Sequence, residues 1–274
     1  MELTLQESWS EVFQDGTEKV HVIADFDGTL TQEYYDGKRR PSIISVLRDE
    51  PEYLSPEYQI RAHQLFDHYH PFEKDTSHPL SYRKAQMEEW WRKAYELLVE
   101  FGLNKRHLEK LANNGVIEFR PGAKDFLRKM SDLGIPVVIM SASGLGEIIK
   151  MFCHSQGVDF PNIHYAVNQF EWNEDGSVKS QKGPIIHSLN KDETTMDIFP
   201  DIHEQIRHRT NVVLLGNSLG DAHMCDGFPV GKLVKIGFLD QVDPQYSQQL
   251  VEFSKVYDFV LNQSGYQDLN KLIV

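Results

Sequence analysis

Two aspartates, Asp25 and Asp27, stand two residues apart immediately after a short apolar run. The run at residues 20–24 reads Val-His-Val-Ile-Ala, which is typical of a strand buried on both faces. Both carboxylates would then lie at the carboxyl end of that strand, where open α/β sheets bind their ligands. Because like charges repel and burial disfavours both, the pair needs a cation or a shared proton. The pair is therefore a candidate for chemistry that uses a bound cation or a shared proton.

Two other interpretations of this pair are weaker. The spacing Asp25-x-Asp27-Gly28 superficially resembles a calcium-binding loop, but Leu30 stands where such a loop requires glycine, and a strand instead of a helix precedes it. A solvated acidic turn is disfavoured because apolar residues lead directly into the pair.

The surrounding pattern predicts a doubly wound α/β fold with a parallel sheet. Four β-branched runs predict strands at residues 20–24, 137–140, 212–215 and 233–236. Helical patterns lie between them, notably at residues 146–156, where an apolar stripe ends at Gly157. The apolar stripe consists of Ile148, Ile149, Phe152 and Cys153. Alternation of strands and helices is typical of parallel sheets with helices on both faces.

About a hundred residues separate the first two predicted strands, far more than a crossover needs. We therefore expect an inserted helical domain at residues 37–117, called the cap below, and a core made of residues 1–36 and 118–274. One helix is predicted at residues 56–69, and a second carries a stripe that we interpret mainly as packing. The stripe consists of Met87, Trp90, Trp91, Ala94, Leu98 and Phe101. A Glu-Asp-Gly turn at residues 174–176, between residues 165–172 and 177–179, predicts a β-hairpin.

Composition excludes several classes of function. The formal net charge of −13 disfavours binding to nucleic acid polymers. The two cysteines, Cys153 and Cys225, make neither a disulfide framework nor a paired metal motif, which favours a cytoplasmic protein. No apolar run is long enough to cross a membrane, and no leader pattern opens the chain. His68 and His70 have no cysteine or carboxylate at metal-ligand spacing, so we treat them as surface or packing residues.

Three further segments, taken with Asp25 and Asp27, resemble the motifs of haloacid dehalogenase-type phosphatases in their order. Residues 25–31, D-F-D-G-T-L-T, resemble the first motif, D-x-D-x-[TV]. Ser141 ends a predicted strand and resembles the second motif, although alone it could equally cap the following helix. A lysine follows, either Lys182 or Lys191, and residues 216–221, G-N-S-L-G-D, resemble the last motif.

The resemblance extends to one branch, the cytosolic pyrimidine 5′-nucleotidases, also called cytosolic 5′-nucleotidase III, over roughly residues 18–230. The family's Y-x-G-K-R-x-P-[TS] stretch is similar to residues 35–42. Its short aromatic segment with a base-contacting glutamate is similar to residues 70–75, and its M-x-E-W-[WY] helix is similar to residues 87–91 and 97–100. By position, Lys191 and not Lys182 matches the family's phosphate-binding lysine.

The resemblance implies a role for each matched residue. Asp25 would attack phosphorus to give an aspartyl-phosphate, and Asp27 would protonate the leaving ribose oxygen and later activate water. Ser141 and Ala142 would bind the phosphoryl group together with Lys191. The magnesium site implied by the resemblance consists of Asp25, the Asp27 carbonyl, Asn217 and Asp221. The cap residues that would face the nucleobase are Glu73 and Ala94.

Three departures from the family pattern bear on these expectations. Gly28 stands where this branch usually has methionine, and Ala94 where relatives have a serine that touches the base. Asn217 replaces the aspartate that usually completes the magnesium site, which predicts weakened metal binding. Glu73 could also be a solvated loop carboxylate.

The leading hypothesis is a Mg²⁺-dependent 5′-nucleotidase acting on a pyrimidine nucleotide such as CMP or UMP, or on 7-methyl-GMP. We expect a monomer or weak oligomer whose partner is a small nucleoside monophosphate. One alternative is a related phosphatase for another small phosphomonoester. The other is a catalytically weak nucleotide-binding protein, motivated by Asn217; the Asp25 and Asp27 pair argues against it, because a pure binding site gains nothing from two carboxylates facing a phosphate.

Overall fold

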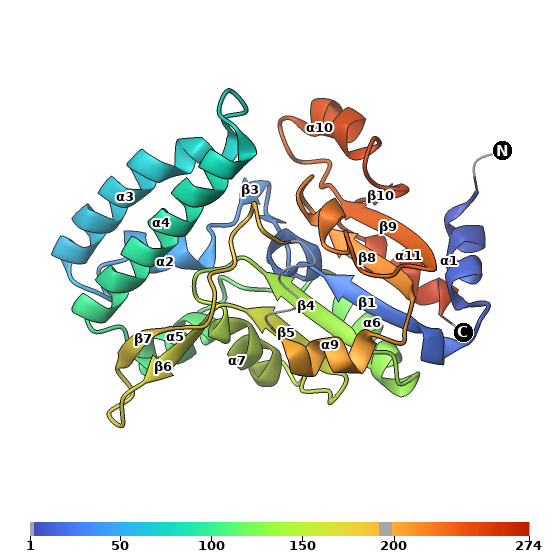
Figure 1. Cartoon of the computed structure of the whole chain (residues 1–274), viewed down its shortest axis with the longest axis horizontal. Coiled ribbons are helices and arrows are strands. Elements are labelled where there is room, and N and C mark those ends of the chain that lie inside the picture. The colour runs from blue at the N-terminus through green and yellow to red at the C-terminus, as the bar shows by residue number, and fades with distance from the viewer. Residues whose placement is uncertain (1–2, 192–198, 274) are drawn as a thin grey trace.

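The computed structural model describes residues 3–191 and 199–273. Within them, a six-stranded sheet has the order β10-β9-β8-β1-β4-β5, and every pair of neighbours is parallel (Figure 1). The strands are β1 (Val20–Ala24), β4 (Val137–Ser141), β5 (Ile163–Val167), β8 (Asn211–Gly216), β9 (Lys232–Phe238) and β10 (Phe259–Leu261). The predicted α/β fold and all four predicted strands are confirmed. β5 and β10 were not expected as strands of this sheet.

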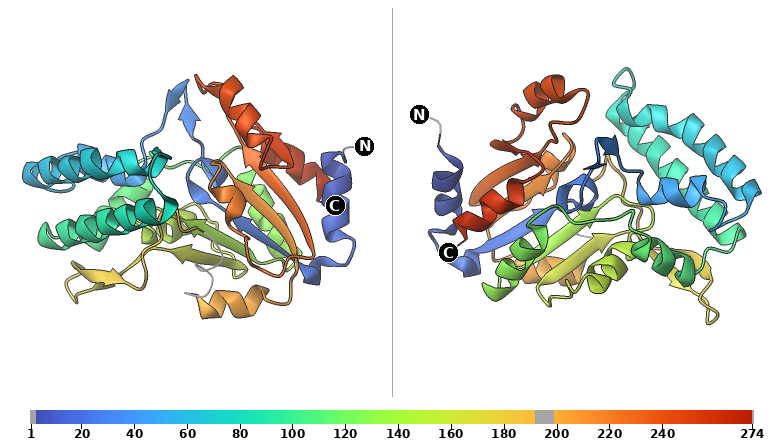
Figure 2. Two further views of the ribbon diagram at one scale, coloured as in Figure 1. Left: turned by 45° about the horizontal axis from the view of Figure 1, so that its top comes forward. Right: turned by 180° about the vertical axis from the view of Figure 1, so that it is seen from behind.

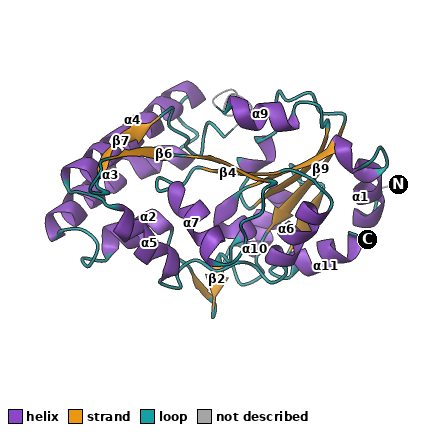
Figure 3. Cartoon of the chain, turned by 90° about the horizontal axis from the view of Figure 1, so that it is seen from below, coloured by secondary structure: helices purple, strands orange, loops and turns teal. Residues whose placement is uncertain are grey.

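The strands form because their apolar residues are divided between two faces. Val22 and Ala24 of β1 belong to one hydrophobic cluster, and Ile23 belongs to the other. Both faces are therefore covered by helices, as Figure 3 shows. Helices contributing to the first cluster are α1 (Leu5–Phe13), α6 (Ala123–Asp132), α7 (Glu147–Ser155) and α11 (Gly265–Leu272). Elements contributing to the second are α9 (Pro200–Ile206), the 221–228 segment with η3 (Asp221–His223), and α10 (Tyr246–Phe253).

The central strand β1 positions the chemistry, because it lies between β8 and β4. Ala24 at its end is in register with Leu215 of β8 and with Ile139 of β4. Asp25, the Ser141 segment and the loop after Gly216 therefore leave the sheet at one edge. This is the edge where parallel sheets bind ligands.

Between the turn after β1 and core helix α6 the chain forms a small hairpin and four helices, of which α3 and α4 extend away from the sheet (Figure 2). The elements are β2 (Tyr34–Tyr35), β3 (Lys38–Arg39), α2 (Ile43–Asp49), α3 (Pro56–Lys74), α4 (Leu80–Glu100) and α5 (Lys105–Asn113). Helix α3 was predicted to end at residue 69 but continues through Pro71 to Lys74. α3 and α4 pack against each other, whereas α5 packs on core helix α7.

The predicted hairpin is present as β6 (Gln169–Trp172) and β7 (Val178–Lys182), but its first arm is shorter than expected. Residues 165–167 belong to β5, and buried Asn168 makes the corner. Its side chain donates to Ser143 O and Ile186 O and accepts from Ile186 N. The hairpin lies beside the inserted helices, with the Phe170 ring 5.6 Å from that of Tyr95 on α4. The division into a 37–117 cap and a core remains a proposal, and we extend that cap to include this hairpin.

Both cysteines are buried and free of disulfide bonds. Across residues 3–191 and 199–273, the structure contains no helix with the length and apolar character needed to cross a lipid bilayer.

Candidate active site

Asp25 lies at the carboxyl end of β1, where its N–H donates to Leu215 O at 3.0 Å. The next five residues, Phe26–Leu30, form an irregular helical turn. Gly28 occupies the left-handed region at φ 76°, which favours glycine. Thr31 closes the turn, because its hydroxyl accepts from Gly28 N and donates to Phe26 O, each at 3.1 Å. The turn places Asp25 and Asp27 at the floor of a cleft.

Lys191 lies between two buried carboxylates. Its Nζ donates to Asp25 Oδ1 at 2.6 Å and to Asp221 Oδ1 at 2.7 Å. Burial raises the pKa of Asp25 to about 7, although the Lys191 ammonium opposes that rise. Burial alone would lower the pKa of Lys191, but the carboxylates of Asp221 and Asp25 outweigh it and raise that pKa above its usual value. Lys191 therefore remains a cation that lines the same cleft as Asp25 and Asp27. Lys182, the other candidate, is exposed on β7.

Asp221 orders the loop after β8. Its Oδ2 accepts from Asn217 N at 3.2 Å, from Ser218 N at 3.0 Å and from Ser218 Oγ at 2.8 Å. Because its other oxygen faces Lys191, protein donors occupy both oxygens of the Asp221 carboxylate. These contacts hold Lys191 and the loop in place, and the role of Asp221 as a magnesium ligand stays a prediction.

The predicted magnesium site combines the side chains of Asp25, Asn217 and Asp221 with the Asp27 carbonyl, and it stays a prediction. Within the described part of the chain, no three histidine, cysteine or acidic side chains lie close enough together to hold a metal ion. The Thr29 hydroxyl lies within hydrogen-bond distance of two oxygens of this predicted site, Asp25 Oδ2 at 3.0 Å and Asn217 Oδ1 at 3.3 Å. A carboxylate and an amide oxygen are hard donors of the kind that Mg²⁺ prefers. Asp25 and Asn217 therefore fit magnesium, with one formal charge between them.

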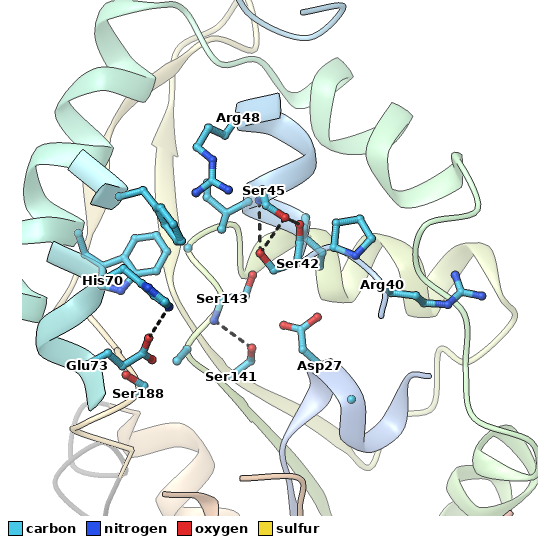
Figure 4. Close-up of a pocket in the computed structure, with 18 of the residues that line it drawn as sticks. Asp27, Arg40, Ser42, Ser45, Arg48, His70, Glu73, Ser141, Ser143 and Ser188 are labelled. Carbon is cyan, nitrogen blue, oxygen red and sulfur yellow. Dashed lines mark hydrogen bonds and ion pairs between the residues drawn. The ribbon is translucent and has the colours of Figure 1, made fainter. Parts of the chain in front are cut away.

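Asp27 is half-buried and points into the cleft (Figure 4). Burial raises the pKa of its carboxyl group to about 6, partly offset by Lys191. A carboxyl group with a pKa near neutrality can both deliver and accept a proton at physiological pH.

Ser141 is the last residue of β4 and is almost fully buried. Its Oγ accepts from Ser143 N at 3.1 Å, and Ala142 lines the cleft beside it. The helix that follows is capped at Gly146 without any side-chain hydrogen bond. Ser141 therefore does not cap that helix, which removes the alternative interpretation of its position.

The cleft has a volume of about 680 Å³, and helices α3 and α4 form its wall opposite the aspartates. Much of the predicted packing stripe on α4 lines this cleft instead of a closed core. The residues that α4 contributes are Met87, Trp90, Trp91, Ala94 and Leu97. From α3 come Tyr58, Ala62, Leu65, Phe66, His70, Glu73 and Lys74. The wall thus offers several aromatic surfaces and one carboxylate.

Glu73 lies in the last turn of α3, so it is not a loop residue. Arg83 of α4 donates to Phe72 O at 2.9 Å and also to Glu73 O, which ties the end of α3 to α4. His70 Nε2 lies 3.7 Å from Glu73 Oε2, and its ring stacks on Phe66 with centroids 4.5 Å apart. The interpretation of His70 as a surface or packing residue was therefore incomplete, because its side chain also lines the cleft.

Arg120 is a site-supporting residue that sequence reasoning missed. Its Nε and Nη2 both donate to Gly28 O, at 3.0 and 2.6 Å. Its guanidinium also pairs with Asp240, and neither side chain is exposed. No local pattern in the sequence marks this role; Arg120 is notable there only for its position soon after the predicted insertion.

Comparison with known proteins agrees with this arrangement. The family model for pyrimidine 5′-nucleotidase (UMPH-1) matches residues 28–274. The chain belongs to this family. The match reaches the C-terminus, beyond the residues 18–230 over which we noted the resemblance.

Three curated relatives show how far the similarity extends along the chain. The chain is 33% identical to the 7-methylguanosine phosphate-specific 5′-nucleotidases of Rattus norvegicus and Homo sapiens, in each case over 97% of this chain and 87% of the relative. It is 31% identical to the putative cytosolic 5′-nucleotidase 3 of Caenorhabditis elegans, over 90% of this chain and 66% of that protein.

Solved structures give the same result. The crystal structure of cytosolic 5′-nucleotidase IIIB bound to cytidine aligns with a TM-score of 0.83 at 27% identity, covering 97% of this chain and 88% of that one. A probable phosphoserine phosphatase from Vibrio cholerae aligns with a TM-score of 0.51 at 11% identity, over 94% of this chain and 68% of that one, which shows a shared fold. The family and the haloacid dehalogenase-like fold are thereby confirmed, and with them the class of enzyme, a 5′-nucleotidase.

Proposed function

We propose that this protein is a Mg²⁺-dependent 5′-nucleotidase that hydrolyses nucleoside 5′-monophosphates through an aspartyl-phosphate on Asp25. The observation that carries the proposal is the placement of Asp25 against Lys191, at the floor of a cleft whose opposite wall is aromatic. The floor suits a phosphate and the wall suits a planar base. The relatives named above, including one bound to cytidine, support a nucleotide as the small-molecule partner.

Asp25 is the proposed nucleophile. Lys191 and Thr29 occupy one oxygen each, which holds the carboxylate in one orientation. Attack on phosphorus divides the hydrolysis into formation and breakdown of an acyl phosphate, each easier than direct displacement by water. Magnesium, when bound beside Asp25 and Asn217, would neutralise negative charge on the phosphate and so let two anions meet.

Asp27 is the proposed general acid and base. Its raised pKa keeps part of the population protonated near neutrality, so it can protonate the departing ribose oxygen. The resulting carboxylate then accepts the proton of the water that hydrolyses the intermediate. Lys191 and Ser141, with the Ala142 segment, would bind the equatorial phosphoryl oxygens, where negative charge develops.

The aromatic wall is the proposed nucleoside site. Trp90 and Trp91 stack on each other with centroids 5.6 Å apart, and both border the cleft. Glu73 is the proposed acceptor for base N–H groups, and Ala94 borders the same space without a polar group. A pyrimidine, as in CMP or UMP, and 7-methylguanine, as in 7-methyl-GMP, are the proposed bases.

One assay tests the proposal. Phosphate release is measured with Mg²⁺ for CMP, UMP, 7-methyl-GMP, GMP and small sugar phosphates, using the wild type and Asp25→Asn. We expect turnover of at least one nucleoside monophosphate and its loss in Asp25→Asn. Turnover that survives this substitution would refute the nucleophile assignment.

The same panel of substrates distinguishes the proposed function from two alternative functions. Preference for a sugar phosphate would favour a phosphatase for another phosphomonoester, for which the apolar Ala94 leaves room. Nucleotide binding without turnover would favour a catalytically weak relative, which the neutral Asn217 motivates. Asn217→Asp should then raise turnover and lower the Mg²⁺ concentration needed for half-maximal rate.

Cellular setting and assembly belong to the same proposal. We propose a cytoplasmic enzyme, supported by the relative named as cytosolic and by the two unpaired cysteines. We propose a monomer or weak oligomer with no nucleic acid polymer as partner, in line with the net charge of −13.

A further inference from the structure

Asn217 presents opposite ends of its amide to two different neighbours. Its Oδ1 accepts from the Thr29 hydroxyl on the side of Asp25, and its Nδ2 donates to Glu33 Oε2 at 3.4 Å. The two ends of an amide have nearly the same shape, so the surrounding donors and acceptors decide which end faces the metal side. An ionised carboxylate only accepts hydrogen bonds, so Glu33 favours the orientation in which the amide oxygen faces Asp25.

Glu33 also brings negative charge to a site that lacks it. Asn217 is neutral, so the two side chains that fit magnesium, Asp25 and Asn217, bring one negative charge between them, and the Lys191 ammonium lies 2.6 Å from Asp25 Oδ1. The Glu33 side chain is only 14% exposed and lines the same cleft. A carboxylate in that position favours a nearby cation by Coulomb attraction that water screens incompletely.

Arg39 pairs with the other oxygen of Glu33, at 2.8 Å, but does not cancel this effect. The Arg39 side chain is 68% exposed, so its charge is well solvated. Oε2 of Glu33 accepts from Asn217 Nδ2.

Gly28 makes this arrangement possible. A Cβ built on Gly28 would lie 2.1 Å from Asn217 Nδ2 and 3.4 Å from Glu33 Cβ. The space that a side chain at position 28 would fill is therefore occupied by the Asn217 amide and bordered by Glu33. Gly28, Glu33 and Asn217 therefore lie against one another, although they come from the turn after β1, the segment before β2 and the loop after β8.

We propose that Glu33 is a positioning residue of the magnesium site: it orients Asn217 as a neutral oxygen ligand and restores the negative charge that an aspartate would have supplied. This inference rests on the magnesium dependence proposed above. It assigns to Glu33 a role that none of the sequence motifs covers.

The test measures Mg²⁺ binding to the full chain without substrate, by isothermal titration calorimetry. Partners of metal ligands typically contribute tenfold or more to affinity, so Glu33→Gln should raise the Kd for Mg²⁺ about tenfold. Asn217→Asp should lower the Kd. In the Asn217→Asp background, Glu33→Gln should no longer weaken binding, because the charge is present and two adjacent carboxylates repel each other.

Arg39→Gln is the matched control, because it removes the same ion pair and leaves the Glu33 carboxylate in place. Its Kd for Mg²⁺ should stay at or below that of the wild type. Unfolding curves recorded in EDTA show whether each variant is folded before metal is added.

Three results would overturn the inference: an unchanged Kd in Glu33→Gln, an equal loss in Arg39→Gln, or an equal loss from Glu33→Gln in the Asn217→Asp background. Each would leave the nucleotidase proposal intact. A wild-type chain that binds no Mg²⁺ would instead refute the proposed magnesium dependence, and this inference with it. If Glu33→Gln does not fold, Asn217→Asp still decides, because a Kd no lower than that of the wild type would overturn the charge argument.

Discussion

Arg120 and Asp240 form a buried ion pair, with exposed side-chain fractions of 0% and 2%. Nη1 lies 2.6 Å from Oδ1 and Nη2 lies 3.2 Å from Oδ2. Because the same guanidinium donates twice to Gly28 O, the pair ties the aspartate-bearing turn to the end of β9. The catalytic turn is therefore supported by residues about a hundred and two hundred positions further along the chain.

Arg120→Met should destabilise the protein strongly. It leaves Asp240 buried without its cation and Gly28 O without its donors, and breaking a buried pair from one side typically costs about 3–5 kcal/mol. The free energy of unfolding is measured in urea, with Arg207→Met as the control, since Arg207 pairs with Glu204 on the surface. A loss below about 1 kcal/mol, the usual range for exposed pairs, would contradict the proposed support.

Asp27→Asn should separate the two half-reactions. With p-nitrophenyl phosphate, whose leaving group needs little protonation, the variant should still release a burst of p-nitrophenol equal to the enzyme concentration. Steady-state turnover of a nucleoside monophosphate should fall by about 10²–10⁴-fold, because acid catalysis of departure and base catalysis of hydrolysis are both lost. The measurement is stopped-flow absorbance combined with phosphate release. Equal losses in the burst and in nucleotide turnover would show that Asp27 acts in some other way.

Gly144→Ala should disturb the contact between the loop after β4 and the aromatic wall. A Cβ on Gly144 would lie 2.0 Å from Cζ3 and 2.5 Å from Cη2 of Trp91. Because the Trp91 ring or helix α4 must move, we expect the KM for the preferred nucleoside monophosphate to rise, while the KM for p-nitrophenyl phosphate changes little.

Trp91→Phe supplies the matched partner for this experiment, since it removes the indole atoms that the new methyl group would meet. The Gly144→Ala penalty in KM should shrink in the Trp91→Phe background. A penalty of the same size in both backgrounds would mean that Gly144 is required for some other reason.

His21 should make stability depend on pH. Its ring is buried, Nδ1 lies 2.6 Å from Arg209 O, and burial lowers the pKa to about 4 from 6.5. Between these values the unfolded chain takes up a proton that the folded chain excludes, so stability is complete above about pH 6.5 and falls as the pH drops toward 4. The loss over that interval should be about 3 kcal/mol, following from about 1.4 kcal/mol per pH unit.

Urea unfolding between pH 7 and pH 4 measures this loss. His21→Gln should flatten the dependence of unfolding free energy on pH, whereas His208→Gln, a change at an exposed histidine, should leave it as in the wild type. An unchanged slope in His21→Gln would show that other groups account for the acid sensitivity.

The sequence by itself determined four strands of the six-stranded sheet and the order of the catalytic segments. Residues 20–24 predict a strand because a mainly apolar run of this length is typical of a strand buried on both faces, and local composition alone shows such a run. The stripe on α7 is equally local, and Ile148, Ile149, Phe152 and Cys153 are all buried as predicted. Asp25 and Ser141 could be placed at one edge because parallel strands end together.

Only the tertiary structure decided which partners these residues have. Lys191 lies between Asp25 and Asp221, and Glu33 meets Asn217, across separations of 30 to 184 residues. The α4 stripe has the same helical period whether it faces a core or a cleft, so periodicity alone could not distinguish them. Hydrogen bonds and ion pairs between distant segments leave no local pattern, because they depend on how the chain returns to one place in space.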